Sequence, residues 1–194
     1  MCATFQIFSD DEVEDLRNIC NQIQKKYGDE AVAKYTHSDF YPKSLVPVID
    51  PNNDVTLLKW GFPMSGKSEV IFNARAESLN EKPIYKNCLT NRCLILATAF
   101  YEWSKAENKR KVQISLADET FFYLAGLWKT YQNADGNKET YFTIITTEPS
   151  EQMKAIHHRM PAIITKEYAP LWLSNYWVDA CGLLRPYERE LKII

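Results

Sequence analysis

The stretch from residue 55 to residue 147 constrains the fold most, because β-branched and aromatic residues recur in it as strand-length segments. These segments are residues 55–62, 92–103, 111–116, 121–131 and 140–147. The last two are separated by residues 132–137, Gln-Asn-Ala-Asp-Gly-Asn, a composition typical of a hairpin turn. We therefore predict a mostly antiparallel sheet in the middle of the chain.

Helical patterns flank this sheet on both sides. Ser9 and Glu12 form a capping box, and apolar residues then recur at helical spacing as far as Tyr27, directly before Gly28. Shorter helices are predicted at residues 150–157 and 166–173. The chain has 194 residues, enough for one full core. We expect one α+β domain over residues 1–194, with a mostly antiparallel, barrel-like sheet and flanking helices.

Charge and cysteine content limit the class of protein. The formal net charge of −2 gives no overall sign of nucleic-acid binding, although residues 82–111 carry seven basic and two acidic side chains. Such a stretch either binds phosphate or is a solvated surface. Five cysteines at irregular spacing argue against a disulfide framework. The sequence has no signal-peptide pattern and no membrane-length apolar run, so we expect a cytoplasmic protein without membrane contact.

Cys2 is the first candidate for chemistry. If Met1 is removed, Cys2 carries a free α-amine and a thiol on neighbouring carbons. The amine has a reference pKa of about 7.7–8.0, so part of it is unprotonated near neutral pH. It can condense with an aldehyde, and the thiol can then close a thiazolidine ring. Cys2 could instead act as a nucleophile in acyl transfer, or be an incidental small residue after the initiator methionine.

Acid–base candidates lie elsewhere in the chain. Glu102 is flanked by aromatic residues, which favours a desolvated carboxyl group suited to proton transfer, although an edge-strand glutamate facing solvent fits the same pattern. His157 and His158 follow a predicted helix and can move protons near neutral pH. Cys88 and Cys93 have no second pair of ligands at zinc spacing, so we predict no metal site.

Two further segments are candidates for binding. In the stretch Asn73–Glu77, alternation in an extended strand would place Asn73, Arg75 and Glu77 on one face, which suits phosphate or sugar recognition as well as a surface salt-bridge cluster. Aromatic and proline residues at 40–42 and 60–63 fit either core packing or a platform for unstacked bases.

Several short motifs follow one another in a recognisable order. They are Met1-Cys2, Tyr41-Pro42, Trp60–Pro63, Asn73–Glu77, Arg92–Ile95, Phe100–Trp103, Ala125–Trp128, Thr146-Thr147 and Ile156–Pro161. Together they resemble the SOS response-associated peptidase (SRAP) family. Each motif alone is weakly specific, but their order over residues 1–173 is highly specific.

The resemblance implies a sensor of abasic sites in single-stranded DNA. Such a protein loses Met1 by self-cleavage, as a cysteine-dependent autopeptidase, and links Cys2 to the ring-opened deoxyribose as a stable thiazolidine. Glu102 would shuttle protons in Met1 removal, crosslinking and reversal. Asn73 would position the sugar or Cys2, and His157 would assist opening of the sugar. Until the ring closes, β-elimination from the Schiff base would give AP-lyase chemistry.

The same resemblance implies a set of DNA contacts and no cofactor. Arg75 and Arg159 would hold the flanking phosphates, and Trp60, Phe62 and Pro42 would contact or wedge the DNA beside the lesion. We expect a monomer whose partner is single-stranded DNA containing abasic sites.

One departure from the family pattern concerns the N-terminus. The family usually begins Cys-Gly-Arg, whereas this chain reads Cys2-Ala3-Thr4. The absent arginine is implied to contact a phosphate, and the candidate replacements are Lys105, Lys109, Arg110 and Lys111.

Two other classes of function stay open at this point. One is a cysteine peptidase or amidase acting in trans through Cys2, which predicts peptide turnover without DNA. The other is a non-covalent single-strand binding module that uses the aromatic residues and the basic stretch 82–111, which predicts unchanged binding by Cys2→Ala.

Overall fold

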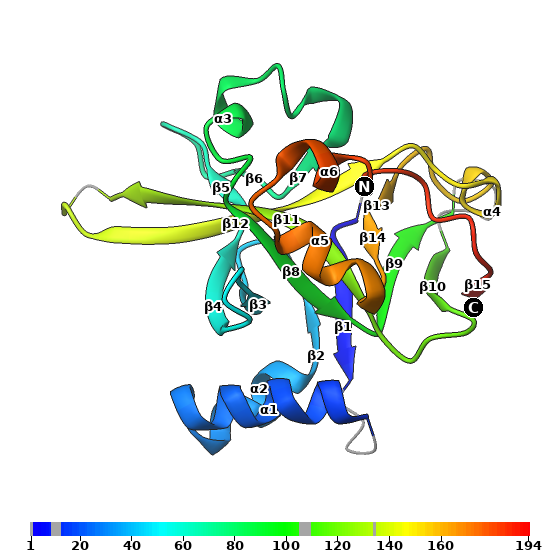
Figure 1. Cartoon of the computed structure of the whole chain (residues 1–194), viewed down its shortest axis with the longest axis horizontal. Helices are drawn as coiled ribbons and strands as arrows, with labels where there is room; N and C mark the ends of the chain where they lie inside the picture. Colours follow the sequence, from blue (N-terminus) through cyan, green and yellow to red (C-terminus); the bar gives the residue numbers. More distant parts are fainter. Residues whose placement is uncertain (1, 9–12, 105–109, 134) are drawn as a thin grey trace.

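The computed structural model describes residues 2–8, 13–104, 110–133 and 135–194 (Figure 1). Its centre is a closed barrel whose strands are β3 (Leu45–Ile49), β4 (Val55–Trp60), β8 (Arg92–Ala97), β11 (Phe122–Gln132) and β12 (Lys138–Thr147). The pairings run from β12 through β4, β3, β8 and β11 back to β12, which closes the ring. Only the β4–β12 pairing in this ring is parallel. The expected α+β fold with a barrel-like, mostly antiparallel sheet is confirmed.

A second sheet lies beside the barrel and contains the N-terminal strand. Its strand order is β15 (Leu191–Ile193), β10 (Lys111–Leu116), β9 (Ala99–Trp103), β1 (Thr4–Phe8) and β2 (His37–Phe40), and every pairing in it is antiparallel. The chain crosses from the barrel to this sheet at Thr98, between β8 and β9. The segment 92–103, predicted as one strand, is therefore two strands in different sheets.

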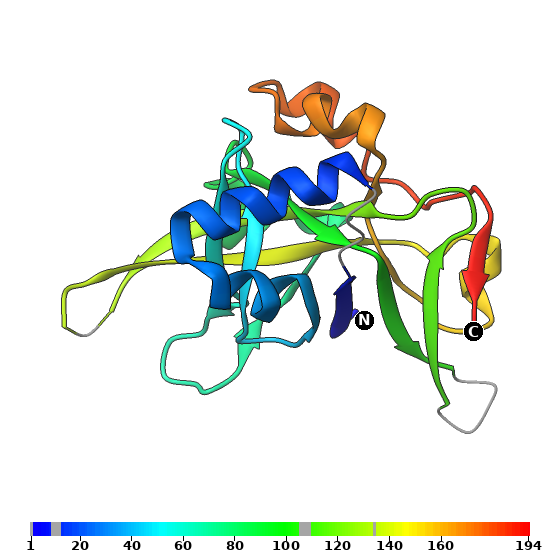
Figure 2. The same cartoon turned by 90° about the horizontal axis from the view of Figure 1, so that it is seen from below.

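Short strands pair with two of the barrel strands, β11 and β12, outside the closed ring. They are β7 (Asn73–Arg75) and β13 (Met160–Pro161), which pair with β12, and β14 (Ile163–Ile164), which pairs with β11. A small ribbon is formed by β5 (Phe62–Pro63) and β6 (Val70–Ile71). Figures 1 and 2 both show the long β11–β12 hairpin projecting from the body of the protein, which confirms the predicted turn between these strands.

Helices surround the sheets. The longest is α1 (Glu14–Tyr27), which buries Leu16, Ile19 and Ile23 and ends at Gly28, where φ is 87°. This left-handed conformation favours glycine and confirms the predicted helix end. The proposed capping residues Ser9 and Glu12 lie outside the described residues. The other helices are α2 (Asp29–Thr36), α3 (Pro83–Lys86), α4 (Glu151–Lys154), α5 (Ala169–Leu173) and α6 (Trp177–Cys181), with 3-10 turns at Ala76–Ser78 and Lys166–Tyr168.

Two close contacts fix the barrel interior and its connection to the C-terminal helices. A Cβ atom on Gly126 would lie 2.5 Å from Ile95 Cδ1 and 2.9 Å from Cys93 Sγ, so the barrel leaves no room for a side chain there. Arg92 is buried and donates to the carbonyl oxygen of Trp172 at 2.7 Å. Its guanidinium also lies over the Trp172 ring, which ties α5 to β8.

Among the described residues, no helix is long and apolar enough to cross a bilayer.

Candidate functional site

Cys2 lies two residues before the start of β1 and is completely buried. Its thiol donates to the carbonyl oxygen of Thr4 at 3.7 Å. Burial raises the pKa of the Cys2 thiol far above its ordinary value, and the nearby Glu102 carboxylate raises it further. The residue is therefore held as a neutral thiol rather than a thiolate.

Asn73 fixes the main chain of Cys2 from the barrel side. It begins β7, which pairs in parallel with β12 so that Asn73 lies opposite Ile144. The Nδ2 atom of Asn73 donates a 2.8 Å hydrogen bond to the carbonyl oxygen of Cys2. The structure thus brings together two residues that are 71 positions apart in sequence.

Glu102 lies on β9 with only 2% of its side chain exposed. Side chains alternate along a strand, so Glu102 shares the inward-facing side of β9 with the buried Phe100, and not the outward side with Trp103. Burial raises the pKa of Glu102, so the carboxyl group keeps its proton to higher pH than an exposed glutamate does. Of the two arrangements that the sequence allowed, the desolvated carboxyl is the one present.

His157 faces Glu102 from the segment after α4. Its Nδ1 lies 4.0 Å from Glu102 Oε1, and its side chain is 13% exposed. The same Nδ1 accepts a hydrogen bond of 3.1 Å from the backbone N–H of Arg159. Nδ1 also lies 3.1 Å from the carbonyl oxygen of Arg159, to which it donates in the tautomer that carries the proton on Nδ1. The His158 ring packs on that of His157, with 4.3 Å between centroids.

Arg159 is buried and engaged by protein carboxylates. Its guanidinium donates to both carboxylate oxygens of Glu77 at 3.0 and 2.9 Å, to Glu148 at 2.9 Å and to the carbonyl oxygen of Thr146 at 2.6 Å. The side chain of Arg159 is 5% exposed, while those of Glu77 and Glu148 are 54% and 74% exposed. Arg159 therefore holds its own loop in place in this structure and does not face solvent.

The expected common face of Asn73, Arg75 and Glu77 is only partly right. The extended conformation covers Asn73–Arg75, and the chain then turns through the 3-10 helix Ala76–Ser78. This turn carries Glu77 to Arg159, whereas Arg75 is exposed. The carboxylates of Glu77 and Glu148 were not predicted as partners of Arg159, since a contact between distant loops leaves no local pattern in a sequence.

The predicted DNA contacts of Trp60 and Phe62 need correction. Both side chains are completely buried. Trp60 donates through Nε1 to the carbonyl oxygen of Phe72 at 2.8 Å and stacks at 6.2 Å from the ring of Phe142. These rings fill the core, so neither can wedge DNA in this conformation. Pro42 is partly exposed and stands in the loop between β2 and β3.

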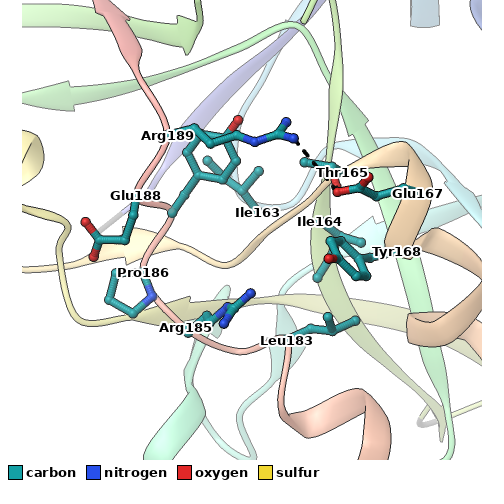
Figure 3. Close-up of a pocket in the computed structure, with 11 residues that line it drawn as sticks. Ile163, Ile164, Thr165, Glu167, Tyr168, Leu183, Arg185, Pro186, Glu188 and Arg189 are labelled. Atoms are coloured by element: carbon teal, nitrogen blue, oxygen red, sulfur yellow. Dashed lines mark hydrogen bonds and ion pairs between the residues drawn. The ribbon is translucent and has the colours of Figure 1, made fainter. Parts of the chain in front are cut away.

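The pocket shown in Figure 3 is separate from this group of residues. It has a volume of about 390 Å³ and lies between residues 163–168 and residues 183–189. None of the predicted site residues lines it. Within the part of the chain that the structure describes, no group of three or more His, Cys, Asp or Glu side chains is arranged to hold a metal ion.

The sequence is similar to that of a known protein family and of several named proteins. Residues 1–194 match the family described as SOS response associated peptidase (SRAP). The abasic site processing protein YoqW of Bacillus subtilis is 36% identical over 203 residues, covering 98% of this chain and 89% of that protein. The abasic site processing protein HMCES of Xenopus tropicalis is 31% identical over 141 residues, covering 60% of this chain and 42% of that protein.

The fold is also similar to a solved structure of a protein from Bacteroides thetaiotaomicron. That likeness has a TM-score of 0.81 at 23% identity and covers 99% of this chain and 90% of that one. At this identity the likeness shows a common fold. Together with the match over the whole sequence, it leads to one conclusion: the chain belongs to the SOS response-associated peptidase family.

Proposed function

We propose that this protein captures abasic sites in single-stranded DNA by forming a covalent thiazolidine through Cys2, after self-cleavage of Met1. The observation that carries the proposal is the convergence of Asn73, Glu102 and His157 on a buried Cys2. The relatives described as abasic site processing proteins support the choice of substrate.

Maturation exposes the reacting amine. Hydrolysis of the Met1–Cys2 peptide bond consumes one water molecule, releases methionine and leaves a free α-amine on Cys2. Glu102 is suited to transfer the protons of this step, because burial raises the pKa of its carboxyl group, which therefore holds a proton to higher pH than an exposed glutamate does.

The crosslink then forms by condensation with the aldehyde of the opened deoxyribose. The Cys2 amine adds to C1′, and the resulting carbinolamine loses one water molecule to give a Schiff base. The Cys2 sulfur attacks the carbon of the C=N bond, and the thiol proton ends on the nitrogen. The sum is aldehyde plus aminothiol giving thiazolidine plus water.

The raised pKa of the Cys2 thiol orders these steps. A neutral thiol is a weak nucleophile, so the unprotonated amine reacts first and the sulfur adds only after the Schiff base has formed. Glu102 donates a proton to the departing hydroxyl group. His157 stands 4.0 Å from Glu102 and relays protons to and from the sugar oxygen during ring opening. Slow reversal retraces these steps: the nitrogen lone pair re-forms the C=N bond as the C–S bond breaks, Glu102 supplies the proton to the departing sulfur, and water then hydrolyses the Schiff base to the aldehyde and the free amine.

The raised pKa of the Cys2 thiol also disfavours a cysteine peptidase acting in trans. That chemistry needs a thiolate beside a general base, in a position that a peptide can reach. Cys2 is buried and held as a neutral thiol, and the charge of Glu102 opposes its ionisation.

The side chains that are exposed to solvent in this structure are the candidates for direct contact with DNA. Arg75 is exposed beside Asn73 and is available to a phosphate next to the abasic residue, and Pro42 is partly exposed. Arg159 reaches DNA only if Glu77 and Glu148 release it, so its role in this proposal is to position the loop that carries His157.

The test is a denaturing gel of the protein with a single-stranded oligonucleotide that contains one abasic site. We expect a heat-stable protein–DNA band for the wild type and for Cys181→Ala, a matched cysteine control, and no band for Cys2→Ala. Intact mass measures Met1 removal in each sample. Complete removal of Met1 without a crosslinked band would overturn the proposal, and DNA-independent peptide turnover would then favour the hydrolase.

A further inference from the structure

The sheet that contains β1 has two faces that differ in their exposure to solvent. The register places one set of side chains on the same side of neighbouring strands, which we call the outer face. The outer face consists of Thr4, Gln6, Phe8, His37, Asp39, Ala99, Tyr101, Trp103, Lys111, Gln113, Ser115 and Lys192. Thr4 and Ala99 are buried, so the other ten residues form its exposed part.

The opposite side of the same sheet is a core surface. Its buried members are Phe5, Ile7, Phe40, Phe100, Glu102, Val112, Ile114, Leu116 and Leu191. Since this side already packs against the rest of the protein, the aromatic residues of the outer face are not needed for the core. Exposed aromatic residues that do not belong to the core commonly mark a binding surface.

Aromatic side chains on the outer face are open to solvent. Phe8 is 57% exposed and Trp103 is 42% exposed, and Tyr41, which directly follows β2, is 49% exposed. Tyr101 lies between them: burial raises its pKa, and the nearby Asp39 and Tyr41 side chains raise it further. Tyr101 and Trp103 are two residues apart on one strand, about 7 Å, so each ring can contact a separate base.

Polar groups fill the spaces between these rings. The Lys111 ammonium group lies 3.9 Å from the centroid of the Tyr101 ring, and 3.9 Å from a carboxylate oxygen of Asp39. Gln113 donates to the side-chain oxygen of Gln6 at 3.4 Å. Two lysines, Lys111 and Lys192, stand against one aspartate on this face, although the whole chain has a formal net charge of −2. Aromatic rings between cations and amides suit single-stranded nucleic acid.

The exposed part of the outer face also lies close to the reacting residue, although Thr4 and Cys2 are themselves buried. Thr4 pairs directly with Tyr101, and β1 runs antiparallel to β9. The chain from Thr4 back to Cys2 therefore runs toward the Trp103 end of β9. Two neighbouring residues on β9 therefore point to opposite sides of the sheet. The Glu102 carboxyl group is turned inward toward Cys2, and the Trp103 ring is turned outward to solvent.

From the proximity of Trp103 and Lys111 to Glu102 and Cys2 we propose that the exposed part of the outer face binds the single-stranded DNA that continues from the abasic residue, with bases stacked on Trp103, Tyr101 and Tyr41 and with Lys111 beside the phosphates. This inference rests on the proposed function, and it extends that function to the DNA on one side of the lesion. The occupant is single-stranded DNA, bound without a requirement for sequence.

The experiment separates this binding from the covalent chemistry. In the Cys2→Ala background, a short fluorescein-labelled oligothymidylate without an abasic site is titrated at low ionic strength, with fluorescence anisotropy as the readout. We expect Trp103→Ala to raise the dissociation constant about fivefold or more, the effect of losing one stacked base, and Trp103→Phe to recover most of the affinity. Lys111→Gln should lower the salt dependence by about one phosphate contact.

Matched controls come from elsewhere on the surface. Tyr176 is 72% exposed and precedes α6, and Lys25 is exposed on α1, so Tyr176→Ala and Lys25→Gln should bind as tightly as the parent. Equal dissociation constants for Trp103→Ala and Tyr176→Ala would overturn the proposal. A self-association in sedimentation that Trp103→Ala abolishes, without effect on DNA binding, would also overturn it and assign the face to a second copy.

Failure of the proposed function gives a different result. A wild-type protein that forms no crosslink, but whose Cys2→Ala form still loses oligothymidylate affinity with Trp103→Ala, contradicts the capture chemistry and leaves the binding face in place. A wild type that crosslinks normally, with no effect of Trp103→Ala on affinity, contradicts only the binding face.

Discussion

The side-chain amide of Asn73 donates a 2.8 Å hydrogen bond to the main-chain carbonyl oxygen of Cys2. This contact joins the barrel, through β7, to the segment that leads into β1 of the second sheet. It fixes the main chain of Cys2 and leaves its amine and thiol free of this restraint. Positioning of this kind affects rate more than affinity, because reacting atoms must lie within a narrow range of distances.

The first prediction concerns this hydrogen bond. Asn73→Ala should lower the crosslinking rate up to about 100-fold, as expected for a displaced reacting group. It should lower the free energy of unfolding by about 1 kcal/mol, the net value of a typical hydrogen bond. Asn73→Asp keeps the shape but cannot donate, so it should be at least as slow. Single-turnover kinetics measure this, and an Asn73→Asp protein with wild-type rates would show that the bond has no role in positioning.

The second prediction concerns stability and pH. Burial raises the folded-state pKa of Glu102 above the ordinary unfolded value of about 4.3. The stabilising contribution is therefore complete below the unfolded pKa and is lost as pH rises through the folded pKa. Glu102→Gln should be more stable than the wild type near pH 8, and the difference should shrink toward pH 4. Urea unfolding at both pH values measures it.

A control residue whose pKa is shifted in the opposite direction lies on the β11–β12 hairpin. Hydrogen bonds from Tyr141 and Lys59 hold the pKa of the partly exposed Glu139 below its usual value. Its contribution is present above the unfolded pKa and lost as pH falls, so Glu139→Gln should shift the pH dependence the other way. If the two variants responded to pH in the same direction, the assignment of a raised pKa to Glu102 would be wrong.

The third prediction concerns the pH dependence of crosslinking. The rate should rise as the Cys2 amine loses its proton, around its reference pKa of about 7.7–8.0. Loss of the proton that Glu102 gives to the departing hydroxyl group opposes this rise, and it does so as pH passes through the raised pKa of Glu102. Glu102→Gln, supplied with Met1 already removed, should be slow and lack this opposing effect. A Glu102→Gln protein whose pH profile has the same shape as that of the wild type would exclude Glu102 as the acid.

The fourth prediction concerns the carboxylates around Arg159. Either Glu77→Gln or Glu148→Gln leaves one carboxylate beside the buried guanidinium, whereas the double variant leaves an unpaired buried charge. The double variant should be destabilised by about 1 kcal/mol more than the two single effects together. Thermal or urea unfolding of all four proteins measures the coupling, with the exposed Glu81→Gln as a control. Simple additivity would mean that Arg159 does not depend on this pair.

The fifth prediction concerns the barrel interior. Gly126→Ala would place a Cβ atom 2.5 Å from Ile95 Cδ1. Overpacking of this kind should lower the free energy of unfolding by about 1–3 kcal/mol. Gly28→Ala, where no atom lies within 4 Å of the added Cβ, tests backbone strain alone at a φ of 87°. Both variants should retain crosslinking at low temperature, because neither residue contacts the site.

Local patterns predicted the elements whose formation depends on local sequence. The strand at residues 111–116 and the helix that ends before Gly28 agree with their predictions, because alternation and capping are properties of neighbouring residues. The N-terminal strand Thr4–Phe8 and the edge strand Leu191–Ile193 were not predicted. Each is too short to show a period, and each is stabilised by pairing with a distant strand.

The site shows the same division. Residue chemistry and the order of the motifs singled out Cys2, Asn73, Glu102 and His157, but the fold brings them together through two sheets and a helix end. Trp60 and Phe62 were expected at the DNA and are core residues, since an aromatic residue in a strand has the same local pattern on either face. Arg159 was expected to face phosphate and faces Glu77, because only the folded chain brings that loop to it.

The place of β1 in its sheet has a mechanical consequence. The strand is not at an edge: β2 pairs with it on one side and β9 on the other. A load applied at residue 2 along the strand direction is therefore resisted in shear, by two ladders of hydrogen bonds that must slip together. An adduct at an edge strand could be peeled away one bond at a time, whereas pulling on this one strains the whole sheet before the N-terminus gives way.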